Sequence, residues 1–412
     1  MTKTTNSVIP DLTLAIDLGG SQTKAIASVF NKNDFPMLLC MEPEIADVSV
    51  VSVENYEKTK SGETDPENTC WVGIGEEYYA VGFLARNKYG GNSLLKQLKE
   101  ENAVPKICGV LWVVSQKLKL MNKFTVSLAV LLPPSEYQDK ERLETKLKQV
   151  LKRFNTPTGE IRVKLVDLNV VPEGVGIYLH RRNILGKNIK NCNLAVAMLG
   201  YRNASVQISN KGAVTPGVSN AFGMSWMLDD FVRRCSGLSK DDPYLIATVV
   251  AAGSECKPEV LATLSRRKSE VEVLAEGQDM SFALQISRDE YFRALVRWLL
   301  QEIPRDIDEL ILCGGTAEYL RSELEAYYSN VKLIWNGGVE IPPALDKVGM
   351  GVRLADVWAL YQVLFGSANL TTKNSNTPTN NSGSTVSGNK VVNLPSPKPK
   401  GFLEMPDKLL CS

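Results

Sequence analysis

The sequence predicts an α/β protein made of two related halves with a cleft between them. Short apolar runs that indicate buried strands alternate with amphipathic or buried helices up to about residue 365. Each half opens with a β-hairpin whose turn carries glycine and polar side chains, and helix–strand alternation follows in both. A duplicated plan of this kind favours two packed units that enclose a ligand site.

Length, charge and cysteine usage narrow the class of protein. A chain of 412 residues is long enough for two domains of ordinary size. Its formal net charge is +1, so no overall field attracts nucleic acid, and direct DNA binding is not expected. The cysteines occur singly, which is typical of reduced thiols in a cytoplasmic protein. Residues 1–13 lack the apolar core of a secretory signal, and no apolar run reaches the roughly 20 residues that cross a bilayer, so any membrane contact is expected to be indirect.

The first half is expected to begin with three strands over residues 12–41, in the runs TLAID, KAIASVF and MLLCM. Short strands and polar loops follow, with strands expected at residues 46–53, 70–75 and 78–85. A buried helix starts at about Val104, and the strand after it is stopped by the proline pair that begins at Pro133. Ser135 is expected to cap a helix that runs to about Phe154.

The second half repeats the alternation after a strand over residues 161–172 that leads into a helix at Gly174. The expected order is then two strands, a helix ended by Gly237, a mostly helical stretch, a strand before a glycine pair, a helix, a strand and a last helix. These elements are expected at residues 193–200, 204–210, 222–237, 238–303, 309–315, 316–328, 331–336 and about 346–364.

The composition changes abruptly at Gly366. Asn, Ser, Thr and Gly without apolar periodicity cannot bury enough surface to offset the entropy of ordering, which predicts a disordered tail over residues 366–412. The end of the tail regains apolar side chains, which suits either docking to a partner or a passive terminus. These side chains are Phe402, Leu403, Met405, Leu409 and Leu410.

The turn after the first strand is the most informative segment of the chain. Its glycines let the backbone approach an anion closely, its hydroxyls and ammonium group add donors and charge, and the carboxylate at the strand end suits a hydrated divalent cation. The residues expected to bind are Asp17, Gly19, Gly20, Ser21, Thr23 and Lys24. Together they suit a nucleoside triphosphate with Mg²⁺, held by Asp17 through water, although a plain hairpin is the alternative for this turn taken alone.

Three further segments carry matching chemistry. Glu173, at a strand-to-helix corner, is expected to orient the water that attacks the γ-phosphate. The second hairpin turn is expected to grip the phosphates from the other side through Gly200, Tyr201 and Asn203. The strand that ends in a glycine pair allows adenosine to lie against backbone, and the next helix offers free N–H groups. This third segment is Gly314, Gly315 and Thr316.

In this order the segments IDLGGSQTK, VVPEGVGIYL, LGYRNASV and LILCGGTAEYL resemble the nucleotide-binding motifs of the actin-like ATPases of the actin, Hsp70 and sugar-kinase superfamily. Within that superfamily the chain is most similar to the bacterial ParM/StbA plasmid-segregation actins and their archaeal relatives. The resemblance covers about residues 10–365. The run VGMGVRLADVWALY resembles the C-terminal helix that returns to the first domain.

The resemblance implies two RNase H-like domains that flank a nucleotide cleft, followed by the disordered tail. Domain I is then expected at residues 1–175, with residues 345–365 returning to it, and domain II at residues 176–344. ATP and Mg²⁺ are the implied ligands, and Glu173 is the implied catalytic residue. Such proteins polymerise head to tail, and a ParR-like adaptor connects the filaments to plasmid DNA.

One residue departs from the motif. The second phosphate motif normally begins with Asp, as in DIGYRT, whereas Met198 stands there in AMLGYRN. A thioether does not replace a carboxylate next to Mg²⁺, because this cation prefers hard oxygen ligands. We therefore expect an ATP-binding filament protein whose hydrolysis is slow or altered.

Two alternative functions stay open. The segment DLGGSQTK also resembles the first phosphate motif of sugar and pantothenate kinases, which implies a small-molecule kinase. Such an enzyme needs a base at the acceptor hydroxyl, and the sequence offers no convincing Asp for it. A cortical filament that shapes the cell, derived from a segregation system, is the other alternative, and Met198 and the tail are compatible with it.

Overall fold

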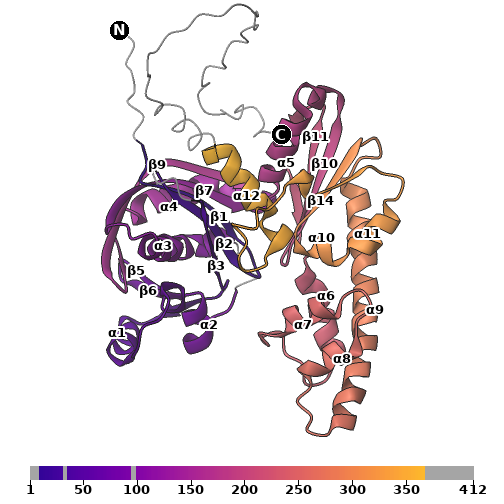
Figure 1. Ribbon diagram of the computed structural model, residues 1–412, viewed down its shortest axis with the longest axis horizontal. Helices are drawn as coiled ribbons and strands as arrows, with labels where there is room; N and C mark the ends of the chain where they lie inside the picture. The colour runs from indigo at the N-terminus through magenta and orange to yellow at the C-terminus, as the bar shows by residue number, and fades with distance from the viewer. Residues whose placement is uncertain (1–8, 31–34, 94–98, 367–412) are drawn as a thin grey trace, which may run out of the picture.

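The computed structural model describes residues 9–30, 35–93 and 99–366 (Figure 1). It forms two lobes that lie side by side, with the first and last parts of the described chain meeting between them. The tail expected over residues 366–412 lies outside the described residues from residue 367 onward. None of the described helices is long and apolar enough to cross a membrane.

The first lobe contains, within the described residues, a nine-stranded sheet. Its strands are β1 (Leu12–Leu18), β2 (Thr23–Val29), β3 (Met37–Met41), β4 (Ile45–Val48), β5 (Trp71–Ile74), β6 (Glu77–Val81), β7 (Lys123–Leu132), β8 (Phe154–Thr156) and β9 (Gly159–Pro172). Their order is β3-β2-β1-β7-β9-β8-β5-β6-β4, with β1 and β2 antiparallel, and with β1, β7 and β9 parallel. The three strands expected over residues 12–41 are confirmed.

The helices of the first lobe are α1 (Val50–Thr59), α2 (Phe83–Tyr89), α3 (Lys99–Lys117) and α4 (Lys140–Val150), with 3-10 helices η1 (Pro66–Asn68) and η2 (Pro134–Asp139). The central strand β1 is buried on both faces. Leu14 packs in the same cluster as Ile107 of α3, whereas Ala15 points to the opposite face and packs with Leu354 and Trp358. Two covered faces explain why β1 is almost continuously apolar.

The second lobe repeats this plan around a six-stranded sheet of the described residues. Its strands are β10 (Asn193–Leu199), β11 (Ala204–Asn210), β12 (Ala213–Val214), β13 (Val218–Asn220), β14 (Glu309–Cys313) and β15 (Leu333–Trp335). The order is β12-β11-β10-β14-β15, and β13 pairs with β11. The hairpin β10–β11 is antiparallel and β10 runs parallel to β14, as β1–β2 and β7 do in the first lobe. The predicted duplication of the hairpin is therefore confirmed.

Helices cover both faces of the second sheet and join it to the first. They are α5 (Val175–Leu185), α6 (Met224–Arg234), α7 (Leu245–Ala252), α8 (Pro258–Leu261), α9 (Glu270–Glu302), α10 (Gly315–Tyr319), α11 (Arg321–Tyr327) and α12 (Ala355–Tyr361), with η3 (Gly186–Asn191), η4 (Ala262–Leu264), η5 (Asn336–Gly338), η6 (Gly351–Leu354) and the π-helix η7 (Gln362–Gly366). Figure 1 shows α12, in yellow, where the two lobes meet.

Helices α5 and α12 pack directly against each other at this junction. A side chain on Gly176 is excluded, because a Cβ there would lie 2.3 Å from the carbonyl oxygen of Asp356. The close approach of the two helices thus depends on glycine. Since α5 follows the last strand of the first sheet and α12 follows the last strand of the second, their contact couples the lobes.

Several predicted elements differ from the structure. The strand expected over residues 78–85 ends at Val81 and α2 begins at Phe83, and the last helix, expected from about residue 346, begins as η6 at Gly351. The strand expected over residues 46–53 ends at Val48, and α1 begins instead, because the Ser49 side chain caps it by accepting the Ser52 N–H. Ser135 does not cap a long helix: it lies in the 3-10 helix η2, and α4 starts only at Lys140. The helix expected at 316–328 is interrupted at Leu320, between α10 and α11.

Candidate functional site

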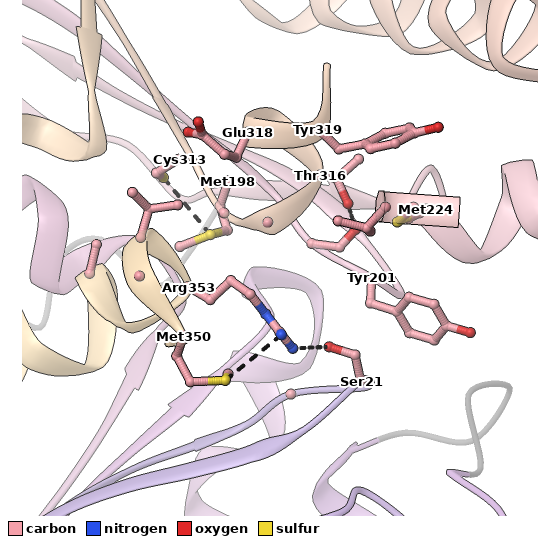
Figure 2. Close-up of a pocket in the computed structure, with 18 of the residues that line it drawn as sticks. Ser21, Met198, Tyr201, Met224, Cys313, Thr316, Glu318, Tyr319, Met350 and Arg353 are labelled. Carbon is pink, nitrogen blue, oxygen red and sulfur yellow. Dashed lines mark hydrogen bonds between the residues drawn. The ribbon is translucent and has the colours of Figure 1, made fainter. Parts of the chain in front are cut away.

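A cavity of about 810 Å³ is lined by segments of both lobes (Figure 2). This volume suits a small ligand of nucleotide size. The cavity brings together four segments that the sequence analysis singled out, although up to 299 residues separate them. The predicted residues that line it are Asp17, Gly19, Gly20, Ser21, Lys24, Glu173, Gly200, Tyr201, Asn203, Gly314, Gly315 and Thr316.

Thr23 is the predicted residue that does not line the cavity. It is 3% exposed and opens β2, where it pairs with Leu18 and Met41. Successive side chains of a strand point to opposite faces, so Lys24 faces the cavity and Thr23 points away from it.

The first hairpin turn is tightly folded and its charges are paired. A Cβ on Gly19 would lie 2.5 Å from the carbonyl oxygen of Gln22, so the turn requires glycine there. The Lys24 ammonium lies 2.5 Å from the Asp17 carboxylate and donates to the carbonyl oxygen of Arg353 at 2.9 Å. Lys24 therefore holds the hairpin to the segment before α12, and part of its charge is neutralised inside the protein.

The second hairpin turn is attached to the start of α10. The Gly200 N–H donates to the carbonyl oxygen of Asn203 at 2.9 Å, which closes the turn. The Thr316 hydroxyl donates to the carbonyl oxygen of Gly200 at 2.8 Å. Gly314 has a φ of +96°, and a Cβ on it would lie 2.3 Å from the carbonyl oxygen of Leu199. The glycine pair therefore allows β14 to end directly beside β10.

The short helix α10 gives less support to an anion than the sequence suggested. It spans only Gly315–Tyr319, and its Gly314 cap has no side chain. A single helical turn sums few peptide dipoles, so its N-terminus is a weak electrostatic site. Any phosphate recognition here depends on the turns and on charged side chains.

Glu173 stands between the last strand of the first sheet and α5. Its N–H donates to the carbonyl oxygen of Leu132 at 2.7 Å, and Gly174, with a φ of +89°, then turns the chain into the helix. The half-buried Glu173 side chain lines the cavity. A carboxylate in this place can orient a water molecule at a bound phosphate.

Asp356 of α12 also lines the cavity and was not recognised in the sequence. Its carboxylate accepts the Gly174 N–H at 2.7 Å and the Ile177 N–H at 3.2 Å, which satisfies two donors of the first turn of α5. Burial raises the pKa of Asp356 to about 7; the two backbone bonds oppose this shift, and the charges of Asp17 and Glu173 add to it. The sequence signal that could have identified this residue is a single Asp within the otherwise mostly apolar run of residues 354–361, which is buried in the structure.

Two sulfur atoms lie at the wall of the cavity where the second phosphate motif would place a carboxylate. The Met198 sulfur lies 3.8 Å from the Cys313 sulfur, as Figure 2 shows. Burial raises the pKa of the Cys313 thiol well above its ordinary value, so this group stays neutral. Neither atom is a ligand that Mg²⁺ prefers.

The donor set of this cavity fits a protein-held Mg²⁺ poorly. Asp17 is already paired with Lys24, and Met198 offers no oxygen. Among the described residues no group of three or more His, Cys, Asp or Glu side chains is arranged to hold a metal ion.

Arg353 is the second lining residue that was not recognised in the sequence. Its guanidinium donates to the Ser21 hydroxyl at 3.1 Å and lies 3.8 Å from the Met350 sulfur. Burial lowers the pKa of Arg353, because the charged form loses water. Figure 2 shows the side chain extending across the cavity from the segment before α12 toward the first hairpin.

Comparison with known proteins gives the class of the fold. Residues 15–176 match the family model described as the N-terminal domain of actin-like proteins. A 15-stranded ParM filament from Clostridium botulinum has a similar structure, with a TM-score of 0.57 and 15% identity, covering 86% of this chain and 99% of that one. No curated protein sequence matches this chain.

Two further solved structures share the fold. Bacillus thuringiensis ParM with AMPPNP has a TM-score of 0.52 and 12% identity, covering 89% of this chain and all of that one (100%). An archaeal actin homolog in complex with ADP has a TM-score of 0.51 and 14% identity, covering 84% of this chain and 97% of that one.

The chain therefore has the actin-like fold, and its first lobe resembles the N-terminal domain of actin-like proteins. More particularly, the resemblance to ParM-type proteins that the motifs indicate is confirmed for the fold.

Proposed function

We propose that this chain is an ATP-dependent filament protein of the ParM type, which polymerises head to tail in the cytoplasm. The observation that carries the proposal is the meeting of two glycine-containing hairpin turns, one from each lobe, at one cavity of about 810 Å³. A ligand gripped from both sides fixes the angle between the lobes. The fit of a head-to-tail interface depends on that angle, and a heterologous contact that does not close into a ring produces filaments.

The site residues have separate proposed roles. The turns at Gly19–Ser21 and Gly200–Asn203 hold the phosphates through backbone N–H groups, and Gly314 and Gly315 leave room for the adenosine. Glu173 orients the attacking water. ATP is the proposed nucleotide; a hydrated Mg²⁺ beside Asp17 stays a prediction, and the paired state of Asp17 argues against strong protein ligation.

The proposed domains follow the two lobes. Domain I comprises residues 1–175 and 345–365, and domain II comprises residues 176–344. The packing of α12 against the sheet of the first lobe supports the return of the chain to domain I. Balanced charge favours a ParR-like adaptor over direct DNA binding.

Two alternatives to plasmid segregation are kept. A cortical filament is favoured if turnover is slow, which Met198 supports because a thioether stands where the motif has a carboxylate. A small-molecule kinase would need a base beside an acceptor hydroxyl. A gene for a small DNA-binding protein next to the gene for this chain would favour segregation. A phosphorylated sugar product would favour the kinase.

The test is light scattering and electron microscopy of the full chain with ATP, AMP-PNP or no nucleotide. Filaments only with nucleotide support the proposal. Glu173→Gln should polymerise with ATP while its hydrolysis falls about 100-fold or more, because a positioned carboxylate contributes that much to proton handling. Glu160→Gln, on the surface of β9, is the matched control and should hydrolyse ATP as the wild type does. No nucleotide binding, or transfer of phosphate to a sugar, would refute the proposal.

A further inference from the structure

Arg353 differs in its pairing from the other cationic side chains of the cavity. In the described part of the chain, the cationic residues that line the cavity are Lys24, Arg202, Arg321 and Arg353. The first three each form a salt bridge with a carboxylate. For Arg353 no carboxylate of the described residues lies within ion-pair distance, and its guanidinium contacts a hydroxyl and a thioether.

The positive charge of Arg353 is incompletely compensated in this arrangement. The half-buried guanidinium of Arg353 has lost part of its water, and neither a neutral hydroxyl nor a sulfur atom replaces an anion in direct contact, although the more distant charge of Asp17 compensates it in part. The lowered pKa of Arg353 reports the same loss. An anionic ligand in the cavity would restore the balance and would be bound more tightly for it.

The position of Arg353 matches the place where phosphates would lie. Its guanidinium reaches Ser21 in the first turn, and its aliphatic part passes 3.3 Å from where a Cβ on Gly315 would stand. It therefore extends from Ser21 of the first hairpin, as Figure 2 shows, to the glycine pair of the second lobe. Lys24 holds the carbonyl group of Arg353 at 2.9 Å, which fixes the backbone from which the side chain extends.

The other sources of positive charge for a polyphosphate are weak in this cavity. Asp17 and Lys24 partly neutralise each other at 2.5 Å. Met198 replaces the motif carboxylate, so the second lobe offers a divalent cation a sulfur atom at that wall. Bound phosphates still need compensation, and a planar guanidinium with several donors provides it in bidentate geometry.

We infer that Arg353 binds the terminal phosphates of the nucleotide and replaces much of the charge neutralisation that a divalent cation would provide, so that nucleotide affinity depends only weakly on Mg²⁺. This inference rests on the proposed nucleotide site. Arg353 is thereby a phosphate-binding residue, and Lys24 is the positioning residue that orients it.

The test is calorimetric measurement of the dissociation constants of ATP, ADP and AMP for the full chain, with excess Mg²⁺ and with EDTA. For the wild type, removal of Mg²⁺ should weaken ATP binding by less than about tenfold. Arg353→Gln should weaken ATP binding in EDTA by about 10- to 100-fold, which is the range of a charge-assisted hydrogen bond, and should change AMP binding about threefold or less. Arg293→Gln, an exposed arginine of α9, is the charge-matched control and should bind as the wild type does.

Two further variants keep the test decisive if Arg353→Gln folds poorly. Arg353→Lys keeps the charge but loses the bidentate fork, so its ATP affinity in EDTA should fall between those of wild type and Arg353→Gln. Met198→Asp adds an oxygen ligand, so chelation should weaken its ATP binding more than it does for the wild type.

The outcomes separate the inference from the proposed function. If wild-type ATP binding survives in Mg²⁺ but falls more than about 100-fold in EDTA, or if Arg353→Gln binds ATP unchanged in EDTA, the inference is wrong and the nucleotide site stands. If the wild type binds no nucleotide in either condition, both are wrong.

Discussion

Asp356→Asn tests the junction between α5 and α12 most directly. The carboxylate is 6% exposed and accepts two backbone N–H groups, from Gly174 and Ile177. Asparagine keeps the size of the side chain but has one acceptor oxygen, so one N–H group loses its partner. We expect the loss of this hydrogen bond to lower the free energy of unfolding by about 1 to 3 kcal/mol at pH 5.

The pH dependence of the wild type supplies the second part of the prediction. The folded-state pKa of Asp356 is raised from 3.8 to about 7, so between these values the folded protein keeps a proton that the unfolded chain has lost. The stabilisation is complete below about pH 4 and is lost as the pH rises through about 7, with a slope of up to about 1.4 kcal/mol per pH unit. Asparagine does not titrate, so the variant lacks this slope.

The assay is urea unfolding followed by tryptophan fluorescence at pH values from 5 to 8. The stability of the wild type minus that of Asp356→Asn should fall by about 2 to 3 kcal/mol across this range. Asp346→Asn is the control for lost hydrogen bonds, because Asp346 also accepts two backbone N–H groups, those of Met350 and Gly351. Parallel pH profiles for wild type and Asp356→Asn would refute the reasoning.

Two other perturbations have defined outcomes. Gly314→Ala places a Cβ 2.3 Å from the carbonyl oxygen of Leu199 at a φ of +96°. In thermal or urea unfolding this variant should lose at least about 2 kcal/mol more stability than Gly62→Ala, where φ is +81° and the space around the residue is open. Equal losses for the two variants would contradict this expectation. Glu136 and Arg202 form a buried ion pair between the lobes, so Glu136→Gln and Arg202→Met should each cost about 3 to 5 kcal/mol, and the double variant less than their sum. Additivity within about 0.5 kcal/mol in the double-mutant cycle would show that the pair is not coupled.

Local sequence patterns were sufficient for the two hairpins. In β1–β2 and β10–β11 the apolar runs, the glycine-containing turns and the pairing partners lie within 20 residues of each other, so chain-local rules decide the register. The same rules failed at residues 49–53, where an apolar run of strand-like composition begins a helix. There the Ser49 cap outweighs composition.

Within the site, sequence order identified the turns but not the side chains that complete them. The motif residues are contiguous, so their chemistry is visible before folding, as in Gly314–Thr316. Thr23 was assigned to the ligand because it is polar and lies in the turn, but strand alternation directs it into the protein.

The sequence by itself determined the alternation of strands and helices, the two hairpins and the absence of a carboxylate at Met198, because these depend on residues that are neighbours in the chain. Only the tertiary structure decided that Arg353 meets Ser21 and that Asp356 caps α5. Both contacts join residues about 180 to 330 positions apart, and no periodicity or local propensity encodes such a distance. They form because the sheets and helices of two lobes pack in one particular way, which brings distant polar groups into a shared, water-poor space.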